Sequence, residues 1–205
     1  SGRSVGILDA DIYGPSLPMM LGINDRPNSP DGKVLDPMEA WGLKAMSIGF
    51  LVPVDTPTIW RGPMVMGALE QLMRDGAWGA LDVLVVDMPP GTGDVQMGLA
   101  KRLPRAEMLV VTTPALAAQK VAIRVANMGR ANYLRIVGVI ENMSAYVSED
   151  GRRHEWFGAG GGSALAADIG APLLGSIPLD GAVAKAGDTG RPIALSEGPA
   201  ADAYR

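Results

Sequence analysis

The sequence has no cysteine among its 205 residues and only one histidine, His154. Without cysteine, disulfide bonds and thiolate metal sites are excluded, and a secreted disulfide scaffold is not expected. A single histidine also excludes a zinc site built from several imidazoles. No run of about 18 apolar residues occurs, so no membrane-spanning helix is expected. The start of the chain lacks the pattern of a signal peptide, and we expect a cytoplasmic location.

Positive charge is also scarce, with 18 Lys and Arg against 22 Asp and Glu and a net charge of -4. A nucleic-acid partner needs a basic face, so none is expected. Apolar residues make up 47% and charged residues 20% of the chain, which is typical of a folded domain with a buried core. The last residues, 202–205, end without a Gly or Pro stop signal. We expect one domain, residues 1–205, truncated at both ends.

Short apolar runs alternate with helical segments along the chain. Runs rich in β-branched residues and apolar on both faces are typical of strands buried in a parallel sheet. Residues 67–74, 115–129 and 162–169 have helical spacing, and Gly129 and Gly170 are expected as C-terminal caps. This alternation predicts an α/β fold with a mostly parallel, doubly wound sheet. The apolar runs are residues 5–8, 83–86, 108–111, 136–140 and 173–177.

Residues 24–60 interrupt this pattern and contain five prolines. Two short alternating stretches lie near residues 33–35 and 43–48. We expect a small hairpin excursion with a surface connection here, and no second domain.

Polar residues follow the apolar runs. In open α/β sheets, ligands bind at the carboxyl ends of the strands. Two carboxylate-bearing turns that face one crevice suit Mg²⁺ and a water nucleophile, because Mg²⁺ prefers oxygen ligands, waters and substrate phosphates. The residues in these places are Asp9, Asp11, Asp87, Thr112, Thr113, Asn142, Pro178 and Asp180.

The strongest signal lies at residues 82–94, where four apolar residues end in Asp87 and Pro-Pro-Gly-Thr-Gly-Asp follows. An apolar run ending in Asp has the Walker B pattern, although an aspartate in this place also caps turns. The two prolines stiffen the exit from the strand, and the two glycines let backbone N–H groups approach a phosphate. The segment therefore favours a nucleotide site at Asp87.

This segment resembles the Walker B and switch II segments of the Mrp/ApbC family, within the MinD-like class of P-loop ATPases. Residues 8–16, Leu-Asp-Ala-Asp-Ile-Tyr-Gly-Pro-Ser, resemble the family's switch I. Residues 59–64, Ile-Trp-Arg-Gly-Pro-Met, resemble its motif before the Walker B helix. Residues 157–162, 175–180 and 187–192 resemble segments in the C-terminal half of the family's proteins. The resemblance spans nearly the whole chain in order and implies a P-loop NTPase fold.

The resemblance implies roles for the carboxylates. Asp87 is expected to hold Mg²⁺ through a water, and Asp11 to orient or polarise the attacking water in ATP hydrolysis, since phosphoryl transfer depends on positioning and charge stabilisation. Asp9 either assists or only caps its turn.

Four further residues are implied to contact the nucleotide. Gly91 is expected to offer its backbone N–H to the γ-phosphate, and Asn142 to hydrogen-bond the adenine. Pro178 and Asp180 are expected near the base or the ribose. For Asn142 an alternative stays open, because asparagine at a strand end also closes Asx turns.

One family motif, the Walker A loop Gly-Lys-Gly-Gly-x-Gly-Lys-Ser/Thr, is absent from the sequence. The only Gly-Lys pair, Gly32-Lys33, lies in a Pro-rich stretch. The resemblance implies that a strand, loop and helix of roughly 30 residues precede Ser1 in the parent protein. We expect the chain to be a fragment that binds ATP weakly or not at all, whereas the parent is expected to hydrolyse ATP. Loss of this central strand leaves N–H and C=O groups unpaired at about 1–3 kcal/mol each, so we expect a rearranged or partner-completed sheet.

A second family motif, Cys-x-x-Cys, is also absent. In the family it lets two subunits bridge one [4Fe–4S] cluster through four thiolates. Its positions fall near Ser148 and Gly151, which are not thiolate ligands. His154 alone cannot replace them and is expected to be a satisfied loop or surface histidine. The sequence therefore argues against an iron–sulfur cluster bound by this chain, although the family resemblance implies one.

The resemblance implies an Mrp-type ATPase that uses ATP and Mg²⁺, works as a homodimer and helps to assemble or transfer iron–sulfur clusters. Client or scaffold proteins are the expected partners, without a membrane or nucleic acid. One alternative is a positioning ATPase of the MinD/ParA type, which needs a membrane helix or a basic DNA-binding face. The other is a non-catalytic scaffold, because both family motifs are absent.

Overall fold

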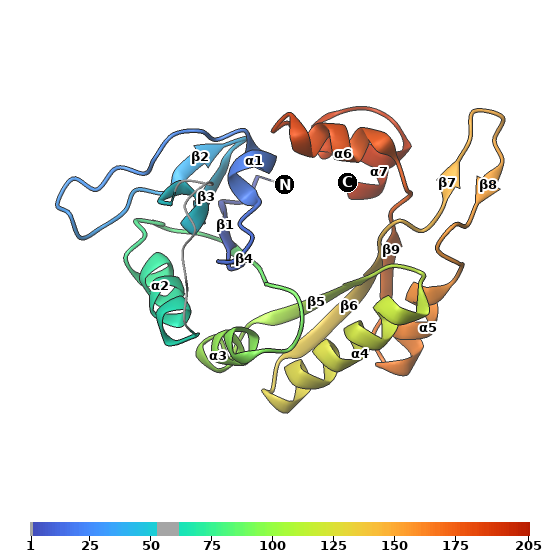
Figure 1. Cartoon of the computed structure of the whole chain (residues 1–205), viewed down its shortest axis with the longest axis horizontal. Helices are drawn as coiled ribbons and strands as arrows, with labels where there is room; N and C mark the ends of the chain where they lie inside the picture. Colours follow the sequence, from blue (N-terminus) through green and yellow to red (C-terminus); the bar gives the residue numbers. More distant parts are fainter. Residues whose placement is uncertain (1, 53–61) are drawn as a thin grey trace. The chain divides into compact units, whose positions relative to one another are not determined.

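The computed structural model describes residues 2–52 and 62–205. The chain divides into two compact units, each with its own sheet of mostly parallel strands (Figure 1). The predicted α/β fold with mostly parallel strands is confirmed. The first unit comprises the residues up to Pro90 and Ala186–Pro192, and the second comprises Gly91–Lys185 and Ile193–Arg205.

The first unit contains strands β1 (Val5–Asp9), β2 (Met38–Ala40), β3 (Leu43–Ser47) and β4 (Val83–Asp87). They form one sheet in the order β2-β3-β1-β4. β1 runs parallel to β3 and β4, whereas β2 is antiparallel to β3. The register pairs Asp9 with both Ser47 and Asp87. Three polar strand ends therefore meet at one edge of this sheet.

Two helices and a short 3₁₀ turn pack on this sheet: α1 (Leu17–Leu21), α2 (Gly62–Arg74) and η1 (Ile48–Phe50). α1 has a proline in its first turn and ends at Gly22, whose φ of 69° is left-handed. The apolar side chains form two buried clusters, which fix the sheet against the helices. Their members are Leu8, Met46, Leu72 and Trp78 in one, and Leu17, Leu21, Ala45 and Phe50 in the other.

The second unit contains strands β5 (Glu107–Thr112), β6 (Arg135–Glu141) and β9 (Leu173–Ser176), which form an all-parallel sheet in the order β5-β6-β9. Helices α4 (Leu116–Ala131) and α5 (Gly161–Asp168) pack on it (Figure 1). The core between them is made of small and branched side chains, Val110, Ala122, Ala126, Val139, Leu165, Ala166 and Ile169.

The remaining elements are short. A two-stranded antiparallel hairpin, β7 (Tyr146–Val147) and β8 (Arg153–His154), follows β6. The others are α3 (Asp94–Arg102), α6 (Gly181–Asp188), η2 (Ile193–Leu195) and α7 (Pro199–Tyr204). No helix in the described residues is long and apolar enough to cross a membrane.

The predicted strands and helices are present, with two corrections. The hairpin expected within residues 24–60 is formed by β2 and β3, but its first arm is Met38–Ala40 and not the stretch near residues 33–35, where Leu35 forms only an isolated bridge with Gly76. β3 also lies inside the main sheet, beside β1, so it is more than a surface excursion. Gly129 is not a C-terminal cap, because α4 continues to Ala131. A Cβ at Gly129 would lie 2.8 Å from Met108, so close packing explains this glycine.

Two strands are less covered than the sequence predicts. Their apolar runs indicate burial on both faces, yet Val85 of β4 is 46% and Val111 of β5 is 56% exposed. Val110 is buried, because α4 and α5 cover one face of β5. In the described part of the chain, no strand pairs with the second edge of β4 or of β5.

Candidate functional site

Asp9 ends β1 and is buried, with 1% of its surface exposed. Its carboxylate accepts hydrogen bonds from the backbone N–H of Asp11 (3.1 Å), the N–H of Leu17 (3.2 Å) and the hydroxyl of Ser47 (3.0 Å). Burial raises the pKa of Asp9, and these hydrogen bonds oppose the rise. The contacts are those of a carboxylate that fixes the loop after β1, the capping alternative for this residue.

Asp11 lies in that loop and is partly exposed. Its Oδ1 accepts the backbone N–H groups of Tyr13 and Gly14, both at 3.2 Å, and so closes an Asx-type turn. The turn fixes the carboxylate beside the end of β1 and leaves part of it open to solvent.

Asp87 ends β4 and is exposed. The backbone carbonyl of Asp87 accepts the N–H of Ala10 at 2.9 Å, which ties the end of β4 to the loop after β1. Desolvation by neighbouring protein atoms raises the pKa of the Asp87 carboxyl, and the negative charges of Asp9 and Asp11 raise it further. Three carboxylates therefore repel one another at this edge of the sheet.

This carboxylate edge, defined by Asp9, Asp11 and Asp87, fits Mg²⁺ bound through water. In the described residues, no three His, Cys, Asp or Glu side chains are grouped closely enough to hold a metal by themselves. Mg²⁺ commonly keeps several waters and uses one or two carboxylates together with substrate phosphates. Asp87 is an exposed carboxylate, and a cation beside it would relieve its repulsion with Asp9 and Asp11. This arrangement matches that mode of Mg²⁺ binding.

The carboxylate edge makes the stability of the chain depend on pH when no divalent cation is present. The pKa values of Asp9 and Asp87 are raised above 3.8 in the folded chain. Their contribution to stability is therefore fully present below about 3.8 and is lost as the pH rises through the raised values. We expect the change Asp87→Asn to reduce this loss as the pH rises above about 4. Urea unfolding in EDTA, followed by tryptophan fluorescence, measures the difference.

The matched control for this prediction is Asp25→Asn, which removes an exposed aspartate of the same unit. The control should keep the pH dependence of the parent chain. An Asp87→Asn variant that loses the same free energy of unfolding over this range as the parent would contradict the repulsion described above.

In the second unit, Asn142 follows β6 and is held by backbone contacts. Its N–H donates to the carbonyl of Thr112 at 2.7 Å, and its Oδ1 accepts the N–H of Met143 at 2.9 Å. Met143 has a left-handed φ of 54°, which turns the chain sharply at this point. The N–H of Ser144 then donates to the carbonyl of Ile177 at 2.9 Å. The ends of β5 and β6 and the segment after β9 are thus joined into one rim.

The other predicted nucleotide contacts have simpler surroundings. Pro178 is partly buried directly after Ile177 on this rim. Asp180 accepts the N–H of Ala182 at 2.8 Å and so caps the start of α6. Gly91 has a left-handed φ of 94° and no atom within 4 Å of an added Cβ. Its N–H is therefore carried by a backbone conformation that favours glycine.

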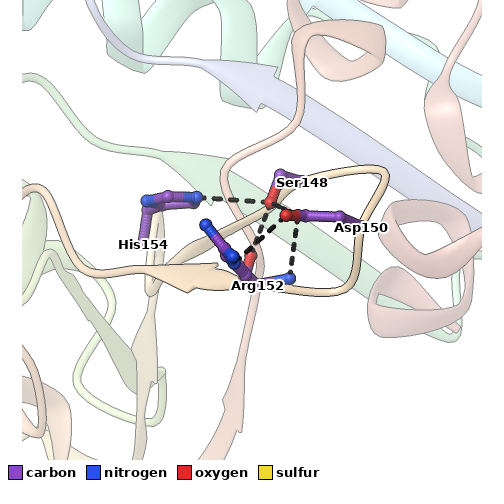
Figure 2. Close-up of polar contacts among 4 residues, drawn as sticks. All are labelled: Ser148, Asp150, Arg152 and His154. Atoms are coloured by element: carbon purple, nitrogen blue, oxygen red, sulfur yellow. Dashed lines mark hydrogen bonds and ion pairs between the residues drawn. The ribbon is translucent and has the colours of Figure 1, made fainter.

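The β7–β8 hairpin carries a group of polar side chains in contact with one another (Figure 2). Ser148 Oγ lies 2.5 Å from Asp150 Oδ1 and 3.2 Å from His154 Nε2. Arg152 forms an ion pair with Asp150 at 3.2 Å. The carboxylate contacts the serine and not the histidine, so this is not a nucleophilic triad. The group is a polar network that closes the hairpin, and His154 is satisfied as expected.

Sequence reasoning missed one buried carboxylate, Glu141, the last residue of β6 and 5% exposed. It accepts the N–H of Gly162 at 2.5 Å. The available sequence signal is an acidic residue at the end of an apolar run, with a Gly-Gly-Gly helix start about 20 residues later. Only the tertiary structure shows that the acidic side chain contacts this helix start.

Solved structures of the same fold define the class of protein. The nucleotide-binding protein of Archaeoglobus fulgidus, in complex with ADP, superposes with a TM-score of 0.82 at 30% identity and covers 100% of this chain and 80% of its own. MinD of Pyrococcus horikoshii, complexed with Mg-ADP, has a TM-score of 0.68 at 19% identity, over 99% of this chain and 81% of its own. The fold is that of the MinD-like P-loop NTPases.

Relatives with higher identity narrow this class. The chain is 48% identical over 203 residues to the iron-sulfur cluster carrier protein of Mycobacterium tuberculosis, covering 95% of this chain and 52% of that protein. It is 46% identical over 199 residues to the protein of the same name from Pseudomonas fragi, covering 96% and 69%. The chain spans about half the length of the mycobacterial relatives it matches.

The family follows from a match over the whole chain. Residues 1–205 match the ParA-type family described as NUBPL iron-transfer P-loop NTPase. The chain belongs to this family, and the resemblance to Mrp/ApbC proteins is confirmed.

Proposed function

We propose that this chain forms part of an Mrp-type ATPase that assists the assembly or transfer of iron–sulfur clusters. The observation that carries the proposal is the carboxylate edge, where Asp87 ends β4 beside Asp9 and Asp11. Family membership and the names of the relatives support the biological role. ATP hydrolysis that requires Mg²⁺ and is lost when Asp87 is changed is the activity that tests it.

Each residue of the site has an assigned task in this proposal. Asp87 holds Mg²⁺ through a water, and Asp11 orients the attacking water from its Asx turn. Bound Mg²⁺ supplies positive charge beside the phosphates. Asn142 hydrogen-bonds the adenine from the rim of the second unit, and Gly91 offers its N–H to the γ-phosphate. Asp9 fixes the loop that carries Asp11.

Two more residues are assigned to nucleotide binding in this proposal. Pro178 lies on the rim that holds Asn142, and Asp180 starts the helix that follows. In the proposal both lie near the base or the ribose. Binding of the phosphates also needs a cradle of backbone N–H groups with a lysine, and the proposal assigns that cradle to residues other than these 205.

The cluster is the cargo in this proposal, and the protein acts as a cytoplasmic homodimer with iron–sulfur client or scaffold proteins. The hairpin that replaces the Cys-x-x-Cys loop offers hydroxyl, carboxylate, guanidinium and imidazole groups. Iron–sulfur clusters are held mainly by thiolates, so these groups do not fit a cluster. The chain is therefore assigned an assisting role without cluster ligands of its own.

Reconstitution tests the assisting role. The 205-residue chain, incubated anaerobically with ferrous iron and sulfide and then desalted, should retain neither iron nor the visible absorption of a cluster, because it has no thiolate. A cysteine-ligated ferredoxin treated in parallel is the positive control. Stoichiometric iron and sulfide that stay with the chain would contradict this assignment and favour direct carriage.

A further inference from the structure

Glu141 joins three elements of the second unit at the rim that carries Asn142. It is the last residue of β6, and only 5% of its surface is exposed. One carboxylate oxygen accepts the N–H of Gly162 in α5 at 2.5 Å. The other lies 3.5 Å from the hydroxyl of Ser176 at the end of β9. One buried side chain at the end of β6 therefore contacts the end of β9 and the start of α5.

The helix that Glu141 contacts has no side-chain cap of its own. Its N-cap residue is Gly160, with a left-handed φ of 71° and no side-chain hydrogen bond. The carboxylate of Glu141 satisfies one of the free N–H groups of the first turn, and a negative charge is favourable at this end of a helix. Glu141 thus acts as a cap supplied from a distant strand.

The glycines at the start of α5 permit this contact. A Cβ at Gly162 would lie 2.6 Å from the Cβ of Glu141, and a Cβ at Gly161 would lie 2.5 Å from the backbone oxygen of Pro114. Such distances are too short for real side chains, so the backbone reaches the carboxylate only because both positions are glycine. The Gly-rich segment is therefore explained by close approach to β6 and to the loop after β5.

The backbone around Glu141 carries the same connection toward Asn142. The carbonyl of Glu141 accepts the N–H of Ile177 at 2.7 Å, and the N–H of Asn142 donates to Thr112 at 2.7 Å. Asn142 is the next residue, followed directly by the left-handed Met143. The orientation of the Asn142 amide thus depends on how the end of β6 is held.

We propose that Glu141 is a positioning residue for recognition of the nucleobase, acting through Asn142. By tying the end of β6 to α5 and β9, it holds Asn142 in the direction that allows its amide to hydrogen-bond adenine. This inference rests on the proposed function, in which Asn142 contacts the base. It assigns Glu141 no contact with nucleotide and no part in hydrolysis.

The substitutions at Glu141 separate hydrogen bonding from charge. Glu141→Gln keeps an oxygen that accepts the N–H of Gly162, and the Ser176 hydroxyl then accepts from the new amide. Glu141→Ala leaves the N–H of Gly162 buried without a partner and opens a space. Glu141→Asp keeps the charge but shortens its reach by one methylene. If Glu141→Gln behaves like the wild type, the hydrogen bond that caps α5 positions Asn142, and the negative charge of Glu141 is not required.

The test is the preference for ATP over GTP in the full-length natural protein that contains this chain. Asn142→Ala should lower this preference about tenfold, the size of one lost hydrogen bond. Glu141→Ala should lower it at least about fivefold while GTP affinity stays within about twofold, and Glu141→Gln should retain most of it. A role in stability alone would weaken ATP and GTP binding together. If the alanine variant does not fold, Glu141→Asp should show the same direction of change.

The outcomes distinguish this inference from the proposed function. If Asn142→Ala loses the preference but folded Glu141→Ala and Glu141→Asp variants keep it, Glu141 is not a positioning residue and the proposed function stands. If Asn142→Ala keeps the wild-type preference, or the wild-type protein has none, the base contact is wrong and the inference is overturned with it.

Discussion

The 205-residue chain alone should bind Mg-ATP about 1000-fold more weakly than the same chain preceded by a strand, phosphate loop and helix. A phosphate cradle contributes several backbone N–H groups and a lysine, and helix N-termini favour phosphate. The described residues offer the carboxylate edge and the proposed base contact of Asn142, which cannot replace that cradle. Isothermal titration of the chain, and of a fusion carrying the strand–loop–helix segment of a relative, measures the difference.

The matched control for this comparison is the same fusion with its two loop lysines changed to alanine. It supplies the added strand without the charge that holds the phosphates. We expect the control to recover stability but not affinity, because the strand pairs with the free edge of β4. Micromolar binding of ATP by the 205-residue chain itself would show that the phosphate loop is not essential.

Much of the fold could be predicted from local sequence. Apolar runs ending in polar residues predicted β1, β4, β5, β6 and β9, because strand pattern and turn residues are local signals. The place of β3 inside the sheet could not be predicted, since strand pairing depends on contacts distant in sequence. The need for glycine at position 129 could not be predicted either, because it results from close packing on Met108, which belongs to another element.

The candidate site could also be predicted only in part from the sequence. The ends of β1 and β4 were expected to bring Asp9, Asp11 and Asp87 together, and the register of these strands does so. Local signals could not reveal the hydrogen bond from the Ser47 hydroxyl to Asp9. They also could not reveal the hydrogen bond that Glu141 accepts from Gly162, 21 residues later at the start of a helix. The roles of the site residues in binding and hydrolysis stay predictions.

The change Asp87→Asn should lower Mg²⁺-dependent ATP hydrolysis by the full-length natural protein about 10- to 100-fold. The amide keeps the size of the side chain but removes the charge that, in the proposed function, holds Mg²⁺ through water, and loss of an outer ligand costs about 10–100-fold in metal affinity or activity. Asp11→Asn should also lower kcat strongly, because the proposed function assigns the Asp11 carboxylate to the attacking water. Asp25→Asn, an exposed aspartate in the same unit, is the matched control.

Asp87 is the residue on which the account depends most. The most direct measurement is therefore the steady-state rate of ATP hydrolysis at saturating Mg²⁺ for wild type, Asp87→Asn and Asp25→Asn, each confirmed as folded. We expect wild-type rates for Asp25→Asn and a rate about 10- to 100-fold lower for Asp87→Asn. A folded Asp87→Asn protein that hydrolyses ATP within about threefold of wild type would contradict the assignment of this strand end as the magnesium site.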